Sequence, residues 1–279
     1  MTRIAVLHPG AMGVTVAASS VEAGHEVHWV TEGRSGDSAE RAERAGLIGQ
    51  PTLSAACDVV DMVISVCPPD AALAVAHGVA ATGFAGVYVD ANAIAPATSE
   101  MVGGCFGAEV RFVDGSIIGP PARRPGTTRL YLSGDDEVRA VAKELSGGPL
   151  EVIAVDGGIG AASALKMAYA GWTKGSSALL LAVAAYADES GVLEGLVAEW
   201  DRSLPGLADD LRARAAGVGP KAWRFAGEMD EIASAFESGG LPGGFHLGAA
   251  AVYAALADFK DAAELPTLEE VVAALRSSR

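Results

Sequence analysis

The sequence predicts an α/β protein in which a doubly wound sheet in the N-terminal half is followed by an all-α C-terminal half. In the first half, short apolar runs typical of strands alternate with alanine-rich segments typical of helices or loops. After Gly157 and Gly158 the pattern changes, and only helical segments follow. We therefore expect two domains, at residues 1–156 and 157–279.

The expected strands are short apolar runs, at residues 3–8, 26–31, 61–67, 86–92, 110–119, 130–134 and 150–156. The expected helices of the second half are separated by turns rich in glycine and proline, and they cover residues 159–186, 190–202, 205–216, 220–238, 244–260 and 267–278.

The segment after the first expected strand is typical of a Rossmann phosphate loop. It consists of Pro9, Gly10, Ala11, Met12 and Gly13. Gly10 would let the backbone approach a pyrophosphate at the helix N-terminus, and Gly13 would allow close packing of helix on strand. His8 stands where the first glycine of the fingerprint belongs, so the tight turn depends on the fixed φ of Pro9. An ordinary strand-to-helix turn is the alternative.

The end of the second expected strand bears on which dinucleotide is bound. It reads Thr31, Glu32, Gly33, Arg34 and Ser35. An acidic residue here would hold a ribose 2′-hydroxyl, whereas Arg34 with Thr31 or Ser35 would accommodate a 2′-phosphate. We expect NADP(H) to be preferred, with NAD(H) as the second choice; ordinary solvated loop polarity is the alternative explanation for these side chains.

Lys166 is the candidate catalytic residue. Between residues 152 and 186 the only other charged residues are Asp156 and Lys174. A helix that is apolar nearly all round is buried, and a buried lysine changes its pKa readily, which prepares it for proton transfer. A structural ion pair or a side chain that reaches the surface is the alternative. Tyr169 shares the helical face of Lys166 and could relay a proton, unless it is a core aromatic.

Composition excludes several classes of function. The chain has 279 residues, 50% of them hydrophobic, and a net charge of −15, so it has no basic face for nucleic acid. The longest apolar run, residues 178–186, is too short to span a bilayer, and no secretory signal is present. Cys57, Cys67 and Cys105 show no metal-ligand spacing. We expect a cytoplasmic protein without a metal, acting on a small-molecule substrate.

Five segments follow one another in the order and spacing of a known set of motifs. They are residues 8–13, SVCP at 65–68, DANAIAPATS at 90–99, DGSIIG at 114–119 and GAASALKMAYAG at 160–171. Together they resemble the β-hydroxyacid dehydrogenase and 6-phosphogluconate dehydrogenase superfamily, over residues 1 to about 185. LHPGAMG, GPPA and GFH look more like a divergent bacterial branch with its own type of C-terminal domain.

The resemblance implies an NAD(P)-dependent oxidoreductase. Residues 1–156 would be the dinucleotide-binding Rossmann domain, and residues 157–279 a helical substrate and dimerisation domain. Hydride would pass between a nicotinamide and a carbonyl or alcohol carbon, with Lys166 as general acid or base. The implied contacts are Cys67, Pro68 and Asn92 to the cofactor, and Ser116 and Gly119 to the substrate.

His246 begins an apolar helix after a glycine-rich turn and is a further candidate for substrate contact. A structural, hydrogen-bonded histidine is the alternative. Two acidic residues on the preceding expected helix, Glu228 and Glu231, are expected to form a solvated face.

The chain departs from the family pattern at the positions that would contact substrate. Ile118 replaces a serine, Ala170 replaces an asparagine, and Tyr169 stands where the sugar-acid members carry histidine. Two alternatives therefore stay open: an imine reductase on the same scaffold, and a dinucleotide-binding sensor without turnover, which His8 and Ala170 would favour.

The stretch from residue 161 to residue 186 offers few polar positions for a solvent face. We therefore expect a homodimer formed through the C-terminal helices.

Overall fold

The computed structural model describes residues 1–278. The chain divides into two compact units, Met1–Met167 and Ala168–Arg279, and each is described by itself. The division falls inside one long helix, whereas the last strand ends at Ala154. We keep residue 156 as the proposed end of the dinucleotide-binding domain.

The first unit contains one eight-stranded sheet with the order β3-β2-β1-β4-β5-β6-β7-β8. All neighbouring strands are parallel except β6 and β7, which are antiparallel. The strands are β1 Arg3–Val6, β2 Glu26–Val30, β3 Ile48–Gln50, β4 Met62–Ser65, β5 Gly86–Asp90, β6 Val110–Ile118, β7 Arg129–Ser133 and β8 Glu151–Ala154. This sheet confirms the predicted fold class. Only the short strand β3 has no counterpart among the predicted strands.

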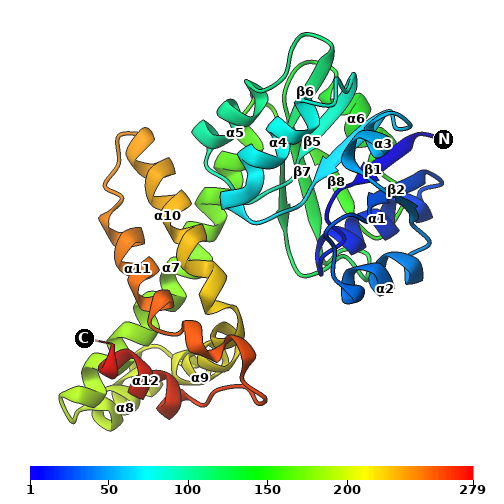
Figure 1. Cartoon of the computed structure of the whole chain (residues 1–279). Helices are drawn as coiled ribbons and strands as arrows, with labels where there is room; N and C mark the ends of the chain where they lie inside the picture. Colours follow the sequence, from blue (N-terminus) through cyan, green and yellow to red (C-terminus); the bar gives the residue numbers. More distant parts are fainter. Residues whose placement is uncertain (279) are drawn as a thin grey trace. The chain divides into compact units, whose positions relative to one another are not determined.

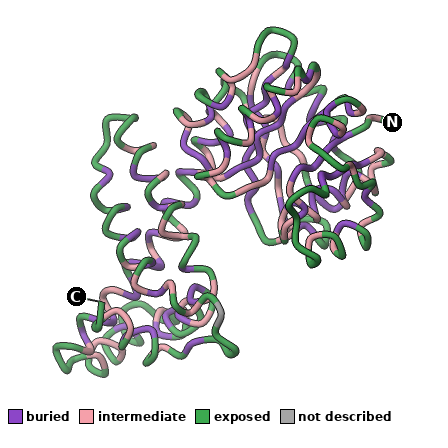
Figure 2. Tube along the Cα trace, viewed as in Figure 1, coloured by how far each residue is buried: buried purple, intermediate pink, exposed green. Residues whose placement is uncertain are grey.

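Helices cover both faces of this sheet (Figure 1). Side chains alternate along each strand, so Ile4 and Val6 of β1 belong to one apolar cluster and Ala5 to the other. The first cluster includes residues of α1 Gly13–Glu22, α2 Gly36–Arg44 and α6 Val138–Leu145; the second includes residues of α3 Leu53–Cys57, α4 Ala72–Ala80 and α5 Pro96–Gly103. A short 3-10 turn, η1 Pro69–Ala71, precedes α4. Figure 2 shows the strands largely as buried chain, as expected for a sheet covered on both faces.

The second unit is helical, as predicted. Helix α7 enters it from the first unit, and the elements are α7 Ala161–Glu189, α8 Leu193–Ser203, α9 Leu207–Val218, η2 Gly219–Lys221, α10 Ala222–Ser238, α11 Gly244–Ala254, η3 Ala257–Asp261 and α12 Leu268–Ser277. Helix α11 ends six residues earlier than the expected helix at 244–260, and the 3-10 turn η3 begins at Ala257. Among the described residues, no helix is both long and apolar enough to cross a membrane.

Glu228 does not lie on a solvated face, so that prediction was wrong for this residue. Its carboxylate pairs with Lys174 of α7, and the two side chains are only 14% and 15% exposed. The Lys174 ammonium also lies 4.6 Å from the ring centroid of Phe225. The error arose because helical spacing within α10 cannot reveal a cation supplied by a helix 54 residues away in sequence.

Candidate active site

The candidate site lies at the carboxyl ends of the central parallel strands, which form one edge of the sheet in the first unit. Strands β1, β4, β5 and β6 are parallel, so their carboxyl ends meet at the same edge, where open α/β sheets bind their ligands. The loop 8–13 follows β1, Cys67 and Pro68 follow β4, and Asn92 follows β5. The structure thus brings together candidates from three separate motifs.

The loop between β1 and α1 makes its tight turn without a first glycine. The Gly10 amide donates to the His8 carbonyl oxygen at 2.8 Å, which closes a turn around Pro9. A Cβ atom on Gly13 would lie 2.1 Å from the same carbonyl oxygen, so only glycine fits there. At Gly10 a Cβ atom would meet nothing within 4 Å, so the backbone borders open space.

The N-terminus of α1 fits a phosphate group. The N-cap residue Met12 supplies no side-chain bond, and the amides of Val14 and Thr15 donate to the backbone carbonyl oxygens of Gly10 and Met12. The positive end of the helix dipole favours an anion beside this first turn. The geometry of Gly10, Met12 and Gly13 therefore suits the pyrophosphate of a dinucleotide.

His8 contributes no positive charge to this loop. Burial, and then the nearby Arg34 guanidinium, lower the pKa of His8 to about 4. Its Nδ1 atom is buried and has no hydrogen-bond partner among the described residues. The imidazole is therefore neutral near pH 7.

The residues expected to read the 2′-phosphate lie together after β2. The Thr31 hydroxyl donates to the carbonyl oxygen of Gln50 at 3.1 Å, and Ser35 caps α2 by accepting from the Ser38 amide at 3.3 Å. Arg34, on the exposed turn between them, is close enough to His8 to affect its pKa.

Arg41 is a further candidate for this site that the sequence patterns did not predict. From α2, its Nε atom donates to the Pro9 carbonyl oxygen at 3.2 Å, and a terminal nitrogen donates to the Ser38 hydroxyl at 3.0 Å. It thereby links the phosphate loop to the turn that carries Arg34 and Ser35. The only sequence signal was its helical spacing from Ser38, which does not separate it from an ordinary solvated arginine.

Asn92 organises the ends of β4 and β5. Its Oδ1 atom accepts from the Cys67 amide at 2.6 Å, and its Nδ2 atom donates to Asp90 at 2.9 Å and to the Ser65 hydroxyl at 3.2 Å. Asn92 is 2% exposed and Asp90 is fully buried. Burial raises the pKa of Asp90 to about 7 and that of the Cys67 thiol to about 11, so Cys67 is a neutral thiol rather than a nucleophile.

Lys166 lies early in α7 and points to the same edge of the sheet. Its Nζ atom donates to the carbonyl oxygen of Ile117, near the end of β6, at 2.5 Å. The neighbouring side chains Ser116 and Ile118 are buried, and the Ser116 hydroxyl has no partner within the described part of the chain. Gly119 ends the strand at a φ of 127°, where a Cβ atom would lie 2.4 Å from the Thr127 carbonyl oxygen.

The remaining candidates belong to the second unit. Tyr169 follows Lys166 by three residues on α7 and is 50% exposed, so it is not a core aromatic within this chain. His246 is 5% exposed and contacts two rings edge-on, with ring centroids 4.3 Å from Phe236 and 5.2 Å from Phe245. Its Nδ1 atom has no hydrogen-bond partner among residues 1–278.

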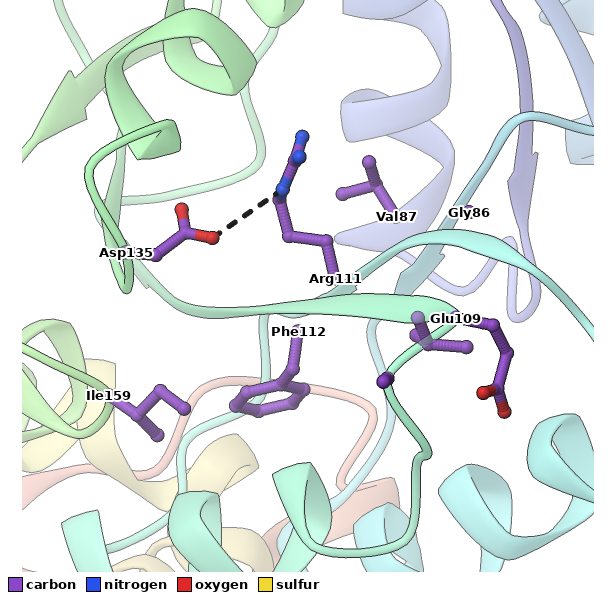
Figure 3. A pocket seen from close by; sticks show the side chains of 9 residues that line it. Gly86, Val87, Glu109, Arg111, Phe112, Asp135 and Ile159 are labelled. Carbon is purple, nitrogen blue, oxygen red and sulfur yellow. Dashed lines mark ion pairs between the residues drawn. The ribbon is translucent and has the colours of Figure 1, made fainter.

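A hollow in the first unit lies at the opposite edge of the sheet (Figure 3). It is lined by residues at the amino ends of β5 and β6, where Arg111 pairs with Asp135 at 3.5 Å and also with Glu137. Ligands of open α/β sheets bind at the carboxyl ends, so this hollow is not the candidate site.

Within the described residues, no group of three or more His, Cys, Asp or Glu side chains could hold a metal ion.

Two comparisons with known proteins match parts of this chain. Residues 187–256 match the family described as Domain of unknown function (DUF1932). An uncharacterized 28.5 kDa protein of Methanothermus fervidus is 31% identical over 172 residues, which is 62% of this chain and 66%, just under two thirds, of that protein.

Solved structures extend the comparison to the whole chain. A conserved protein of unknown function with structural similarity to 3-hydroxyacid dehydrogenases is 26% identical, with a TM-score of 0.70 over 92% of this chain and 98% of that one. The chain is thus similar to a protein that itself has structural similarity to 3-hydroxyacid dehydrogenases.

Two more distant structures share the fold of this chain. The 3-hydroxyisobutyrate dehydrogenase of Mycobacterium tuberculosis is 18% identical, with a TM-score of 0.72 over 99% of this chain and 100% of that one. A reductive aminase of Aspergillus terreus in complex with NADPH and ethyl levulinate is 18% identical, with a TM-score of 0.56 over the full length of both chains. The fold is thus that of dehydrogenases and reductases.

Proposed function

We propose that this protein is an NAD(P)-dependent oxidoreductase that transfers hydride between a nicotinamide and a carbonyl or alcohol carbon of a small substrate. The observation that carries the proposal is the position of Lys166. Its amine is bonded to Ile117 at the carboxyl end of β6, the same edge of the sheet that carries the phosphate loop. A titratable group at this edge is well suited to proton transfer beside a bound dinucleotide.

The residues present fit such a cofactor. Gly10 to Gly13 and the first turn of α1 would hold the pyrophosphate, and Arg34 with Thr31 and Ser35 would favour NADP(H) over NAD(H). The segment Cys67–Pro68, whose backbone Asn92 fixes, would lie beneath the nicotinamide ring. When bound, the nicotinamide supplies or accepts the hydride.

Lys166 would complete the reaction by moving one proton. An ammonium has three donors, and the bond to Ile117 orients the amine. In reduction Lys166 would protonate the developing alkoxide, and in oxidation it would accept the hydroxyl proton. Tyr169, on the same helical face, would relay the proton or orient the substrate.

The substrate would meet few charged donors from the first unit. Ser116 and the Gly119 amide are the proposed contacts at the end of β6, and Ile118 is an apolar side chain where a hydroxyl would otherwise hold a carboxylate. We propose His246 as a further contact. These features favour a substrate whose reacting carbonyl, rather than a carboxylate, provides the main polar recognition.

Reduction of an imine is the second candidate. The apolar side chains of Ile118 and Ala170 favour it, as does the common fold with a reductive aminase. The third candidate, a sensor without turnover, was favoured by His8 in place of the first glycine. That support is weaker because the bond from the Gly10 amide to the His8 carbonyl oxygen closes the loop without this glycine.

We further propose a cytoplasmic homodimer formed through the second unit. On α7, three large apolar side chains recur every seven residues and are exposed: Trp172 at 76%, Leu179 at 52% and Tyr186 at 74%. Seven residues are close to two helical turns, so the three share one face. An exposed apolar stripe of this kind marks an interaction surface, and a second copy of the same chain would cover it.

The test is to titrate the purified protein with NADPH and NADH and then to screen aldehydes, keto acids and cyclic imines for cofactor oxidation. We expect tighter binding of NADPH and turnover of a carbonyl compound. Turnover of cyclic imines alone would favour the second candidate. Binding without any turnover would leave the sensor, and absence of binding would refute all three.

A further inference from the structure

The carboxylate of Asp114 is the centre of a buried hydrogen-bond network in the first unit. Asp114 lies on β6 and is fully buried. Its Oδ1 atom accepts from the hydroxyls of Ser99 at 2.8 Å and Ser163 at 2.6 Å. Its Oδ2 atom accepts from the Ser133 hydroxyl at 3.0 Å and from the amides of Gly160 at 3.1 Å and Ser163 at 3.0 Å.

This network closes the N-terminus of α7. The first amides of a helix need partners from outside the helix. Asp114 provides them for Gly160 and Ser163, and the Ser133 hydroxyl accepts from the Ala162 amide at 2.9 Å. The negative charge of the carboxylate also interacts favourably with the positive end of the helix dipole. Strands β6 and β7 therefore hold the first turn of α7 in place.

The same strand and helix meet again one helical turn further on. Lys166 follows Ser163 by three residues and shares its face of α7, while Ile117 follows Asp114 by three residues on β6. The two contacts are Asp114 to Ser163 and Ile117 to Lys166. Together they fix both the position and the rotation of this part of α7 against the strand.

We infer that Asp114 is the positioning residue for Lys166, setting the place of its amine through the first turn of α7. This inference rests on the proposed role of Lys166 as general acid or base. A small displacement of a catalytic group lowers the rate steeply, by about 10²-fold for 1 Å. Loss of the Asp114 contact to α7 should therefore slow turnover without weakening cofactor binding.

A matched pair of variants separates positioning from general stability. Ser163→Ala and Ser99→Ala each remove one hydroxyl from the same oxygen of Asp114, and both serines are fully buried. Ser163 belongs to α7, whereas Ser99 belongs to α5. Asp114→Asn is the third variant. Its side-chain oxygen can still accept from the two amides, so we expect it to fold. It removes the negative charge beside the first turn of α7 and replaces the acceptor for the Ser99 and Ser163 hydroxyls by a donor.

The readouts are kcat, the pH profile of kcat, the KM for NADPH and the NMR signal of Lys166 in protein labelled with carbon-13 at lysine Cε. Lys166→Met identifies that signal. We expect Asp114→Asn and Ser163→Ala to lower kcat by about 10- to 10²-fold, to shift the pH profile and to move the Lys166 signal. The KM for NADPH should stay constant, and Ser99→Ala should match the wild type in all four readouts.

Equal effects of Ser163→Ala and Ser99→Ala would overturn the inference, as would an unchanged Lys166 signal in Asp114→Asn. If Lys166 is not the general acid or base, Lys166→Met retains the wild-type rate. In that case the NMR signal of Lys166 in Asp114→Asn still shows whether Asp114 positions the lysine.

Discussion

The Nζ atom of Lys166 donates to the carbonyl oxygen of Ile117 at 2.5 Å, across 49 residues of sequence. This bond offsets part of the cost of placing an ammonium on an otherwise apolar stretch of helix. It also brings the amine to the edge of the sheet where the loop 8–13 would bind a dinucleotide.

Gly13→Ala should disrupt the phosphate loop. The added Cβ atom would lie 2.1 Å from the His8 carbonyl oxygen, and overpacking of this kind costs about 1 to 3 kcal/mol. We expect a lower thermal midpoint and weaker NADPH binding, measured by thermal unfolding and fluorescence titration. Gly10→Ala is the control: it meets no protein atom within 4 Å, so it should keep the thermal midpoint and weaken only binding. A Gly13→Ala protein with wild-type midpoint and affinity would contradict this description of the loop.

Arg34→Ala should narrow the preference for NADPH over NADH. It removes a charge-assisted contact to the 2′-phosphate worth about 1.5 to 3 kcal/mol. Arg41→Ala provides the comparison, because Arg41 bonds to the Pro9 carbonyl oxygen and its loss should weaken both cofactors alike. Fluorescence titration with both cofactors checks this, and an unchanged preference in Arg34→Ala would show that the turn after β2 is assigned wrongly.

Asp90→Asn should alter the pH dependence of stability. Burial raises the pKa of Asp90 from 3.8 to about 7, so the folded protein keeps a proton that the unfolded chain releases. Its stabilising contribution is complete below pH 3.8 and is lost as the pH rises through about 7, with a slope of up to about 1.4 kcal/mol per pH unit.

Urea unfolding between pH 5 and 8 gives the free energy of unfolding of the wild type and of Asp90→Asn. The difference between the two proteins, plotted against pH, measures this slope. The lowered pKa of His8 acts in the opposite direction, stabilising the fold above pH 6.5 and losing that effect towards pH 4. This contribution is common to both proteins and cancels. Parallel pH profiles for the two proteins would mean that Asp90 is ionised throughout the range.

Light scattering at micromolar concentration should return twice the chain mass of 28.1 kDa. Trp172→Glu should shift the protein towards the monomer, because it places a charge in the apolar stripe of α7. Leu204→Glu is the control, since Leu204 is comparably exposed at 52% but lies after α8, outside the stripe. A monomeric wild type would rule out the proposed homodimer.

Much of the fold follows from local sequence patterns. The seven predicted strands lie within about two residues of β1, β2 and β4 to β8, because each is a short apolar run between turn signals. Strand β3 escaped prediction because three residues, with Gly49 at the centre, are too few to form a pattern. The loop 8–13 was predicted from its glycines, although only the structure shows how Pro9 replaces the missing one.

The interactions that shape the candidate site were harder to predict, since they join residues far apart in sequence. Arg41 reaches the loop across 32 residues, and its partner there is a backbone oxygen that no sequence pattern marks. Asp114 was predicted only as part of a motif. Its five donors come from four residues on three elements and the turn before α7, and their meeting depends on the tertiary structure.

Lys166→Met removes the amine that we propose moves the proton. Methionine preserves the apolar stem, so the variant should keep its thermal midpoint and its affinity for NADPH. On a substrate that the wild type turns over, we predict that kcat falls by about 10² to 10⁴-fold, the range contributed by positioned proton transfer. A wild-type kcat in Lys166→Met, on the same substrate and with the cofactor bound, would contradict this role of Lys166.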